Sequence, residues 1–277
     1  MASPTLPSKI LIVVDPTQDS AVALDRAIVT AELIAKTKGA PNMRHMHILV
    51  AADMDNNDTS VKNPRMRRDR TWFTDELLAP LDSSGLDYSL EISWSDDWYG
   101  SILKAATEYG AEMIMLPLMK KPSSTDWFFT ESVWRLMRTA GCPVLIVQPE
   151  AQSKRAVILA AVNFQSHKKE YQALNDMIIE RGQWISETYG AEMHVVNAYT
   201  DSLNYPDRSQ LAQRTAVDTA NIHVRKGDPD DVIAQVAREV NADIVVLGTR
   251  SRFSRWRGNT AEKIVKEVHC DILAISK

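Results

Sequence analysis

The sequence has few cysteines, no long apolar run and no excess of positive charge. Cys142 and Cys270 are the only cysteines in 277 residues, which excludes a disulfide framework and is typical of a reducing cytoplasm. The first apolar run, Ile10–Val14, is too short for a secretory signal or a membrane helix. The formal net charge of −4 gives no overall attraction to nucleic acid or to an anionic membrane. We therefore expect a cytoplasmic protein that has no membrane partner.

Recognisable catalytic and metal-binding motifs are also lacking. No Ser-His-Asp set, paired-carboxylate site or lysine nucleophile can be placed by motif. His45 and His47 alternate along an expected strand, without a carboxylate or cysteine at metal-ligand spacing. The sequence thus predicts no catalytic residue and no metal site.

What the sequence does contain is one pattern that occurs twice. Apolar runs open each copy at Lys9–Asp15 and Arg155–Asn163, and residues 111–117 match residues 242–248. Cys142 and Cys270 occupy the same place before the last apolar run of each copy, where a small buried side chain is the default interpretation and a redox sensor the alternative. Because a domain typically has about 150 residues, we expect domains at 1–150 and 151–277, joined by the polar linker 149–154.

Five apolar runs alternate with helical patterns in each copy. Strands that alternate with helices favour an α/β fold, with one doubly wound, Rossmann-like parallel sheet of five strands per copy. The expected strands lie near residues 9–15, 43–51, 86–94, 112–117 and 143–147, and near 154–162, 191–198, 221–226, 243–247 and 271–275.

Doubly wound sheets bind ligands beyond the carboxyl ends of their strands, so the segment 248–262 is a candidate site. It has a glycine at each end of its loop, Gly248 and Gly258, followed by the expected start of a helix at Asn259 or Thr260. Glycine allows close backbone approach, and free N–H groups at a helix start attract anions. Phosphate binding and an ordinary helix cap after a glycine-terminated strand both fit this pattern.

These residues resemble the universal stress protein family, in particular its tandem members of type E. The resemblance rests on Gly248-Thr249, on Gly258-Asn-Thr-Ala-Glu262 and on Val14-Asp15-Pro16 at the first strand end. It implies two domains of the adenine nucleotide α-hydrolase-like type related by a pseudo-twofold axis, and a role in the stress response. Some members bind ATP through Gly-x2-Gly-x9-Gly-(Ser/Thr/Asn), with an acid at the end of the first strand.

The second copy keeps part of the implied nucleotide site. Gly248 and Gly258 match the first and last glycines, whereas Ser251 replaces the middle one and the spacer is shortened. Asn163 stands where the acid is expected, and Ala198 where binders place a small apolar contact. The candidate ligand site of this copy is therefore Asn163, Ala198, Gly248, Ser251, Gly258, Asn259 and Thr260.

The first copy keeps the acid but loses the glycines. Asp15 is present, while Pro117, Lys120 and Thr130 occupy the three glycine positions. Proline removes a backbone donor, and side chains stand where backbone should approach a phosphate. We therefore interpret this copy as a degenerate site. Trp127-Phe128-Phe129 is favoured to plug it or to pack against the other copy, and the alternative is that these aromatics line a pocket for an apolar ligand.

Two basic segments leave alternatives open. Arg250, Arg252, Arg255 and Arg257 suit an anionic ligand, although a solvated basic loop is the favoured interpretation because exposed charges cost little. The run Arg65–Arg70 is of a kind that contacts nucleic acid, but no reader motif accompanies it and the chain is acidic overall.

The sequence therefore favours a non-catalytic stress-response protein that acts by binding a small ligand or a protein partner. An ATP-binding switch with slow hydrolysis at the second copy is the alternative, and nucleic-acid binding ranks below both. The resemblance further implies that the fifth strands, Val144–Val147 and Ile272–Ile275, pair between the copies. A further homodimer of the whole chain remains open.

Overall fold

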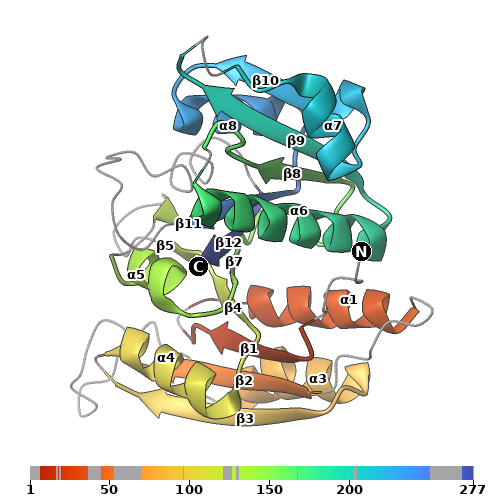
Figure 1. Ribbon diagram of the computed structural model, residues 1–277. Helices are drawn as coiled ribbons and strands as arrows, with labels where there is room; N and C mark the ends of the chain where they lie inside the picture. The colour runs from red at the N-terminus through yellow and green to blue at the C-terminus, as the bar shows by residue number, and fades with distance from the viewer. Residues whose placement is uncertain are drawn as a thin grey trace.

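The computed structural model describes most of the chain. The described residues are 7–16, 18, 20–36, 45–52, 70–95, 97–120, 127–128, 131–166, 168–201, 205–249 and 270–276. They form an α/β fold with one ten-stranded sheet and a separate two-stranded ribbon (Figure 1).

The first half of the chain supplies five parallel strands of the large sheet, in the order β7-β4-β1-β2-β3. The inner strands are apolar and buried on both faces, as expected of a central strand covered by helices on each side. The strands are β1 (Lys9–Val14), β2 (His45–Ala52), β3 (Tyr88–Trp94), β4 (Met113–Pro117) and β7 (Val144–Val147).

The second half repeats this arrangement in the order β10-β9-β8-β11-β12. Its strands are β8 (Val157–Ala161), β9 (Glu192–Tyr199), β10 (Ile222–Lys226), β11 (Ile244–Thr249) and β12 (Asp271–Ser276). The predicted α/β fold with five parallel strands per copy is confirmed, and each strand lies within a few residues of its expected position.

The two halves meet at β7 and β12, the fifth strands of the two copies. These strands are antiparallel, with Ile146 opposite Ile272 and Val144 opposite Ala274, whereas the other neighbours in the large sheet are parallel. Every residue of β7 is buried. The halves therefore share one continuous sheet, and the apolar cluster on each of its faces contains residues of both halves.

Helices cover both faces of the sheet (Figure 1). Two apolar clusters, one on each face, contain alternate residues of the strands, such as Ile10 and Ile12 on one side and Leu11 on the other. The first face carries α1 (Val22–Lys36), α2 (Arg70–Trp72), the π-helix η1 (Phe73–Leu78), α3 (Ala79–Ser84), α6 (Lys169–Tyr189) and α7 (Arg208–Thr215). The second face carries α4 (Trp98–Tyr109), α5 (Glu131–Thr139) and α8 (Pro229–Glu239), and a 3-10 turn, η3 (Thr219–Asn221), precedes β10.

Local sequence signals define the helix ends. The Asp97 carboxylate accepts a hydrogen bond from the Gly100 N–H at the start of α4, and Asp228 caps α8 in the same way. Gly110 and Gly190 end α4 and α6 with φ of 68° and 63°, a left-handed conformation that glycine adopts without steric cost.

A two-stranded ribbon that the sequence analysis did not predict follows β4. It consists of β5 (Met119–Lys120) and β6 (Trp127–Phe128), which pair antiparallel. Strands of two residues are too short to show a periodic pattern, so no sequence signal marks them.

A buried cluster of charged side chains also joins the halves. Asp271 of β12 accepts a 2.8 Å hydrogen bond from Arg155 and lies 3.3 Å from Nε of Arg26 in α1. Arg26 also donates to the carbonyl oxygens of Ala151 and Gln152 in the linker between the copies. Burial lowers the pKa of Arg26, an effect that the Asp271 carboxylate opposes. The cluster thus ties a helix of the first half to the linker and to the last strand of the second.

Candidate functional site

In the first half, a glutamine side chain connects the ends of two neighbouring strands where the sheet order reverses. Asp15 follows β1 and is buried, and Leu118 follows β4, the neighbouring strand. The side-chain amide of Gln18 donates to the carbonyl oxygen of Leu118 at 3.2 Å and to Asp15 Oδ2 at 3.4 Å. The ends of the two strands are therefore bridged by protein where a ligand would be expected.

The three residues at the glycine positions of this half lie in different settings. Pro117 is the buried last residue of β4, in register with Val147 of β7. Lys120 lies in the ribbon strand β5, with its side chain outside the described part, as are the side chains of Trp127 and Phe128. Thr130 and Phe129 lie outside the described residues.

In the second half, two buried asparagines hold the turn after β8. The Asn163 backbone donates to Oδ1 of Asn175 and accepts from its Nδ2, both at 2.9 Å. The N–H of Phe164 donates to Asn197 Oδ1 at 2.8 Å, and Asn197 Nδ2 donates to the carbonyl oxygen of Ala198. Asn197 thus connects Ala198 to Phe164, the residue after Asn163, and the exposed Asn163 side chain stands on a turn held by Asn175 and Asn197.

Gly248 packs against helix α6. A Cβ atom at this position would lie 2.5 Å from Leu174 Cδ2 and 2.8 Å from Leu174 Cγ. The next residue, Thr249, donates to the carbonyl oxygen of Met137 in α5 at 2.8 Å, which links the end of β11 to the first half. Close helix packing is therefore sufficient to explain the glycine at the end of β11.

The rest of the predicted loop lies outside the described residues. This applies to Ser251, Gly258, Asn259 and Thr260, to the arginines between them, and to Arg65–Asp69 of the other basic run.

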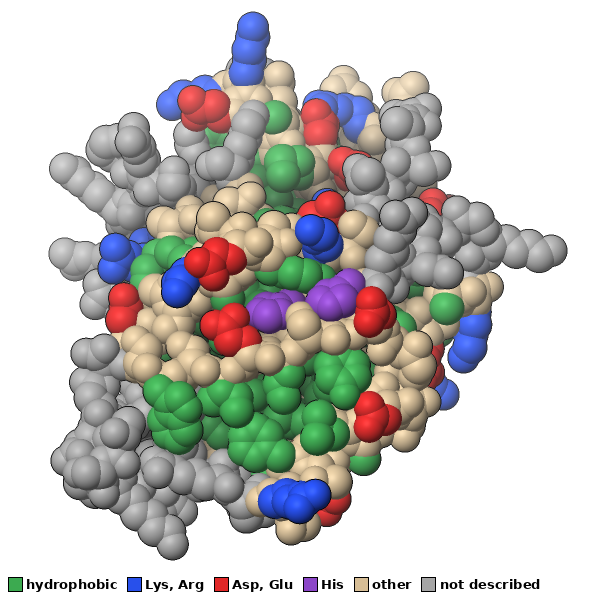
Figure 2. Space-filling view, turned by 90° about the horizontal axis from the view of Figure 1, so that it is seen from below, with side chains coloured by type: hydrophobic (Ala, Val, Ile, Leu, Met, Phe, Trp, Pro, Cys, Tyr) green, Lys and Arg blue, Asp and Glu red, His purple; other side chains and the backbone are tan. Residues whose placement is uncertain are grey.

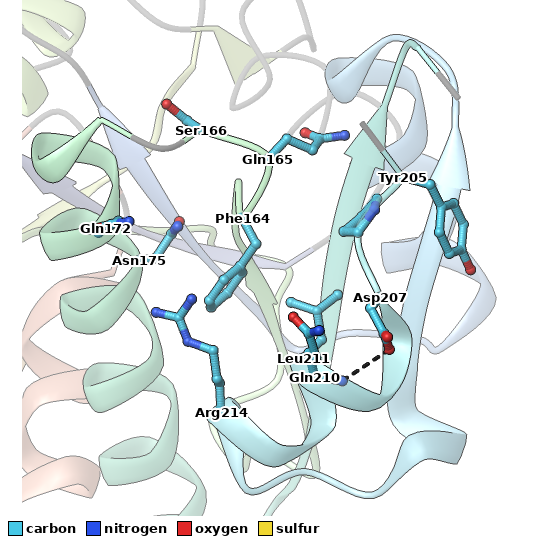
Figure 3. A pocket seen from close by; sticks show the side chains of 11 residues that line it. Phe164, Gln165, Ser166, Gln172, Asn175, Tyr205, Asp207, Gln210, Leu211 and Arg214 are labelled. Carbon is cyan, nitrogen blue, oxygen red and sulfur yellow. Dashed lines mark hydrogen bonds between the residues drawn. The ribbon is translucent and has the colours of Figure 1, made fainter. Parts of the chain in front are cut away.

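A cavity of about 390 Å³ opens beside the turn after β8 (Figure 3). Its volume is within the range of small-molecule sites. It lies between the start of α6 and the start of α7, next to the predicted site residues rather than among them. The lining residues are Phe164, Gln165, Ser166, Gln172, Asn175, Tyr205, Pro206, Asp207, Gln210, Leu211 and Arg214.

The cavity combines a cation, an aromatic ring and several amides. The Arg214 guanidinium lies 4.2 Å from the Phe164 ring centre and 3.7 Å from Asp176, and its side chain remains half exposed. The Asp207 carboxylate accepts hydrogen bonds from the N–H groups of Ser209 and Gln210, so it serves as the cap of α7. Arg214 is therefore the charged group in the lining that remains suited to a ligand.

Sequence motifs gave no indication of this cavity. Its residues come from the turn 164–166, α6, residues 205–207 and α7, and none of them belongs to the glycine pattern.

The two cysteines have little thiolate character. Cys270 is fully buried, and burial raises its pKa; Cys142 is half-buried, and burial raises its pKa to about 11. A thiol of such high pKa reacts slowly near neutral pH, which favours the packing interpretation over a redox sensor.

The repeated strand order defines a tandem α/β protein with two Rossmann-like halves. The universal stress protein family model matches residues 7–148 and 185–276, and the chain belongs to this family. The predicted resemblance is confirmed.

Relatives cover nearly the whole chain. Universal stress protein E of Photorhabdus laumondii is 26% identical over 302 residues, which span 96% of this chain and 94% of that protein. A functionally unknown protein from Pseudomonas aeruginosa PAO1 has a solved structure with a TM-score of 0.77 and 24% identity, covering 98% of this chain and 93% of that one. A universal stress protein from Archaeoglobus fulgidus has a TM-score of 0.67 at 13% identity, with 96% of each chain covered. Within the described ranges, no helix is both long and apolar enough to cross a membrane.

Proposed function

We propose that this chain is a non-catalytic stress-response protein that binds a small ligand in the cavity of its second half. Family membership supports the stress-response role. The observation that carries the binding proposal is the cavity of about 390 Å³ beside the turn after β8, whose lining includes the Arg214 guanidinium and the Phe164 ring.

The lining supports binding rather than catalysis. Its titratable side chains are Tyr205, Asp207 and Arg214, and Asp207 already caps α7. Arginine does not release its proton near neutral pH, and Oδ1 of Asp207 already accepts two backbone hydrogen bonds at the start of α7. The proposal therefore assigns Arg214 to holding a ligand and Asp207 to capping the helix.

The chemistry of the lining selects a small organic anion. A carboxylate or phosphate group pairs with Arg214, while Phe164 and Leu211 contact an apolar part and the glutamine amides bind polar groups. ATP bound at the glycine loop of the second half remains the alternative proposal, because Gly258, Asn259 and Thr260 retain the end of that pattern.

Thermal unfolding with added ligand tests both proposals. The probes are AMP, Mg-ATP and inorganic phosphate at millimolar concentration, since a ligand at 100 times its Kd adds about 2.7 kcal/mol of stability. We expect stabilisation that Arg214→Gln removes and that Arg225→Gln, an exposed arginine outside the cavity, leaves in place.

The outcomes separate the two sites. Stabilisation by Mg-ATP that is lost in Gly258→Val but kept in Arg214→Gln places the ligand at the glycine loop and overturns the cavity proposal. The absence of stabilisation by all three probes overturns both.

A further inference from the structure

One edge of the large sheet exposes a row of apolar side chains. The sheet ends at β3, and Leu90, Ile92 and Trp94 are 37%, 43% and 50% exposed. They alternate along the strand and therefore share one face, next to the half-buried Tyr88. Figure 2, seen from the β3 side of the molecule, shows hydrophobic side chains gathered in one continuous patch at this edge.

The other edge of the same sheet is built differently. β10 occupies the equivalent place in the second half, and its residue Ile222 is buried while Arg225 and Lys226 are exposed. Charged residues on an edge strand prevent other strands from adding to it. Because the two halves share one fold, the apolar edge is a property of the first half and not of the fold.

The row on β3 is complementary to itself. We propose that two copies of this chain associate through their β3 strands, antiparallel, with the twofold axis at Ile92. Ile92 then lies opposite Ile92 of the partner subunit, and Leu90 lies opposite the partner's Trp94. The three exposed apolar residues of each chain then stand beside those of the other on one face of the joined sheet and bury part of each other, with the same surface used by both chains as an isologous interface requires.

Charge repulsion favours this alignment over the one in which the twofold axis passes at Glu91. An axis at Glu91 would place two carboxylates directly opposite each other, and like charges in that position are destabilising. With the axis at Ile92, Glu91 lies opposite the partner's Ser93, an uncharged residue whose hydroxyl donates to Ser101 of its own chain, so the two carboxylates are no longer opposite each other. Glu91 also keeps its 3.2 Å contact with His47 on the neighbouring strand.

This interface is independent of the proposed ligand site. β3 is at one end of the ten-stranded order, and the cavity lies at β8 in the other half. Association and ligand binding can therefore be tested separately.

The mass of the full chain in solution tests the association. Light scattering after gel filtration, at micromolar to submillimolar concentrations, should show a species of twice the chain mass of 31.1 kDa. Ile92→Lys brings two ammonium groups together at the axis and should give a monomer with unchanged circular dichroism. Gln213→Lys adds the same charge at an exposed position of the other half that does not line the cavity, and it should leave the dimer intact. A wild-type monomer at all concentrations, or a dimer that persists in Ile92→Lys, overturns the proposal.

Cross-linking tests the position of the axis. In Ile92→Cys the two introduced thiols are directly opposite, so mild oxidation should yield a covalent dimer. In Glu91→Cys the thiols lie two residues apart along the paired strands, and cross-linking should be much weaker. The wild-type chain, whose own cysteines are half-buried or buried, supplies the background. Equal or stronger cross-linking by Glu91→Cys contradicts the axis at Ile92.

Discussion

At the scale of single residues, Gly248 shows how a motif position can have a structural cause. In the nucleotide-binding pattern of the family, this glycine corresponds to the first glycine of the phosphate loop. In the structure, its position is also the point where β11 approaches Leu174 of α6 too closely for a side chain. The sequence could not distinguish these causes, because both require the same residue.

Replacing Gly248 by alanine should therefore destabilise the fold whether or not a ligand binds. The new Cβ would overlap two carbons of Leu174, a buried residue, and overpacking of this kind costs about 1–3 kcal/mol. Urea unfolding of Gly248→Ala without ligand measures this cost.

Gly182→Ala is the matched control for this substitution. Its Cβ would lie 2.7 Å from Cε and 3.3 Å from Sδ of Met193, the end of a flexible side chain, and alanine is favoured over glycine inside a helix by about 1 kcal/mol. We expect it to be near neutral. If the Gly248→Ala protein is as stable as the Gly182→Ala protein, Leu174 and α6 shift at little cost to admit the new Cβ. Packing is then not the reason for the glycine.

At the scale of elements, the strands were predictable and the links between them were not. Apolar runs such as Ile10–Val14 identify central strands because burial on both faces leaves no polar position. The cavity, the ribbon β5–β6 and the cluster of Arg26, Arg155 and Asp271 leave no local pattern. The members of that cluster are more than 100 residues apart in sequence, and only the folded chain brings them together.

The buried cluster should be the most sensitive link between the linker and the last strand. Asp271→Asn keeps the shape of the side chain but removes the negative charge between two buried guanidinium groups. Removing one partner from a buried ion pair costs about 3–5 kcal/mol, so we expect a loss of that order in chemical unfolding. The reason is the uncompensated charge that remains, not the strength of the bond itself.

The pair of Arg225 and Glu239 is the control for burial. It has the same charges at 3.3 Å, but both side chains are largely exposed. An exposed pair contributes about 0–1 kcal/mol, so Glu239→Gln should change stability little. If Asp271→Asn costs no more than Glu239→Gln, the buried cluster does not hold the linker.

At the scale of the whole molecule, the two copies share more than a covalent linker. β7 and β12 pair across the seam, and one apolar cluster contains residues of both halves. Thr30 of α1 bonds the Tyr189 hydroxyl of α6 at 2.7 Å, and Thr249 bonds the carbonyl oxygen of Met137. The sequence predicted two similar copies, but the extent to which they form one body depends on these long-range contacts.

A shared core and a shared sheet should make the two halves unfold together. Separating them would expose the buried strand β7 to water, which costs the free energy of its apolar contacts. We therefore expect one calorimetric transition whose van't Hoff and calorimetric enthalpies agree. Ile12→Ala in the first half and Ile158→Ala in the second remove buried methyl groups and should each cost about 2–5 kcal/mol. Each substitution should lower the temperature of that single transition, since neither half is stable without the other. If Ile12→Ala shifts one transition while a second stays in place, the copies unfold independently and the seam adds little to their stability.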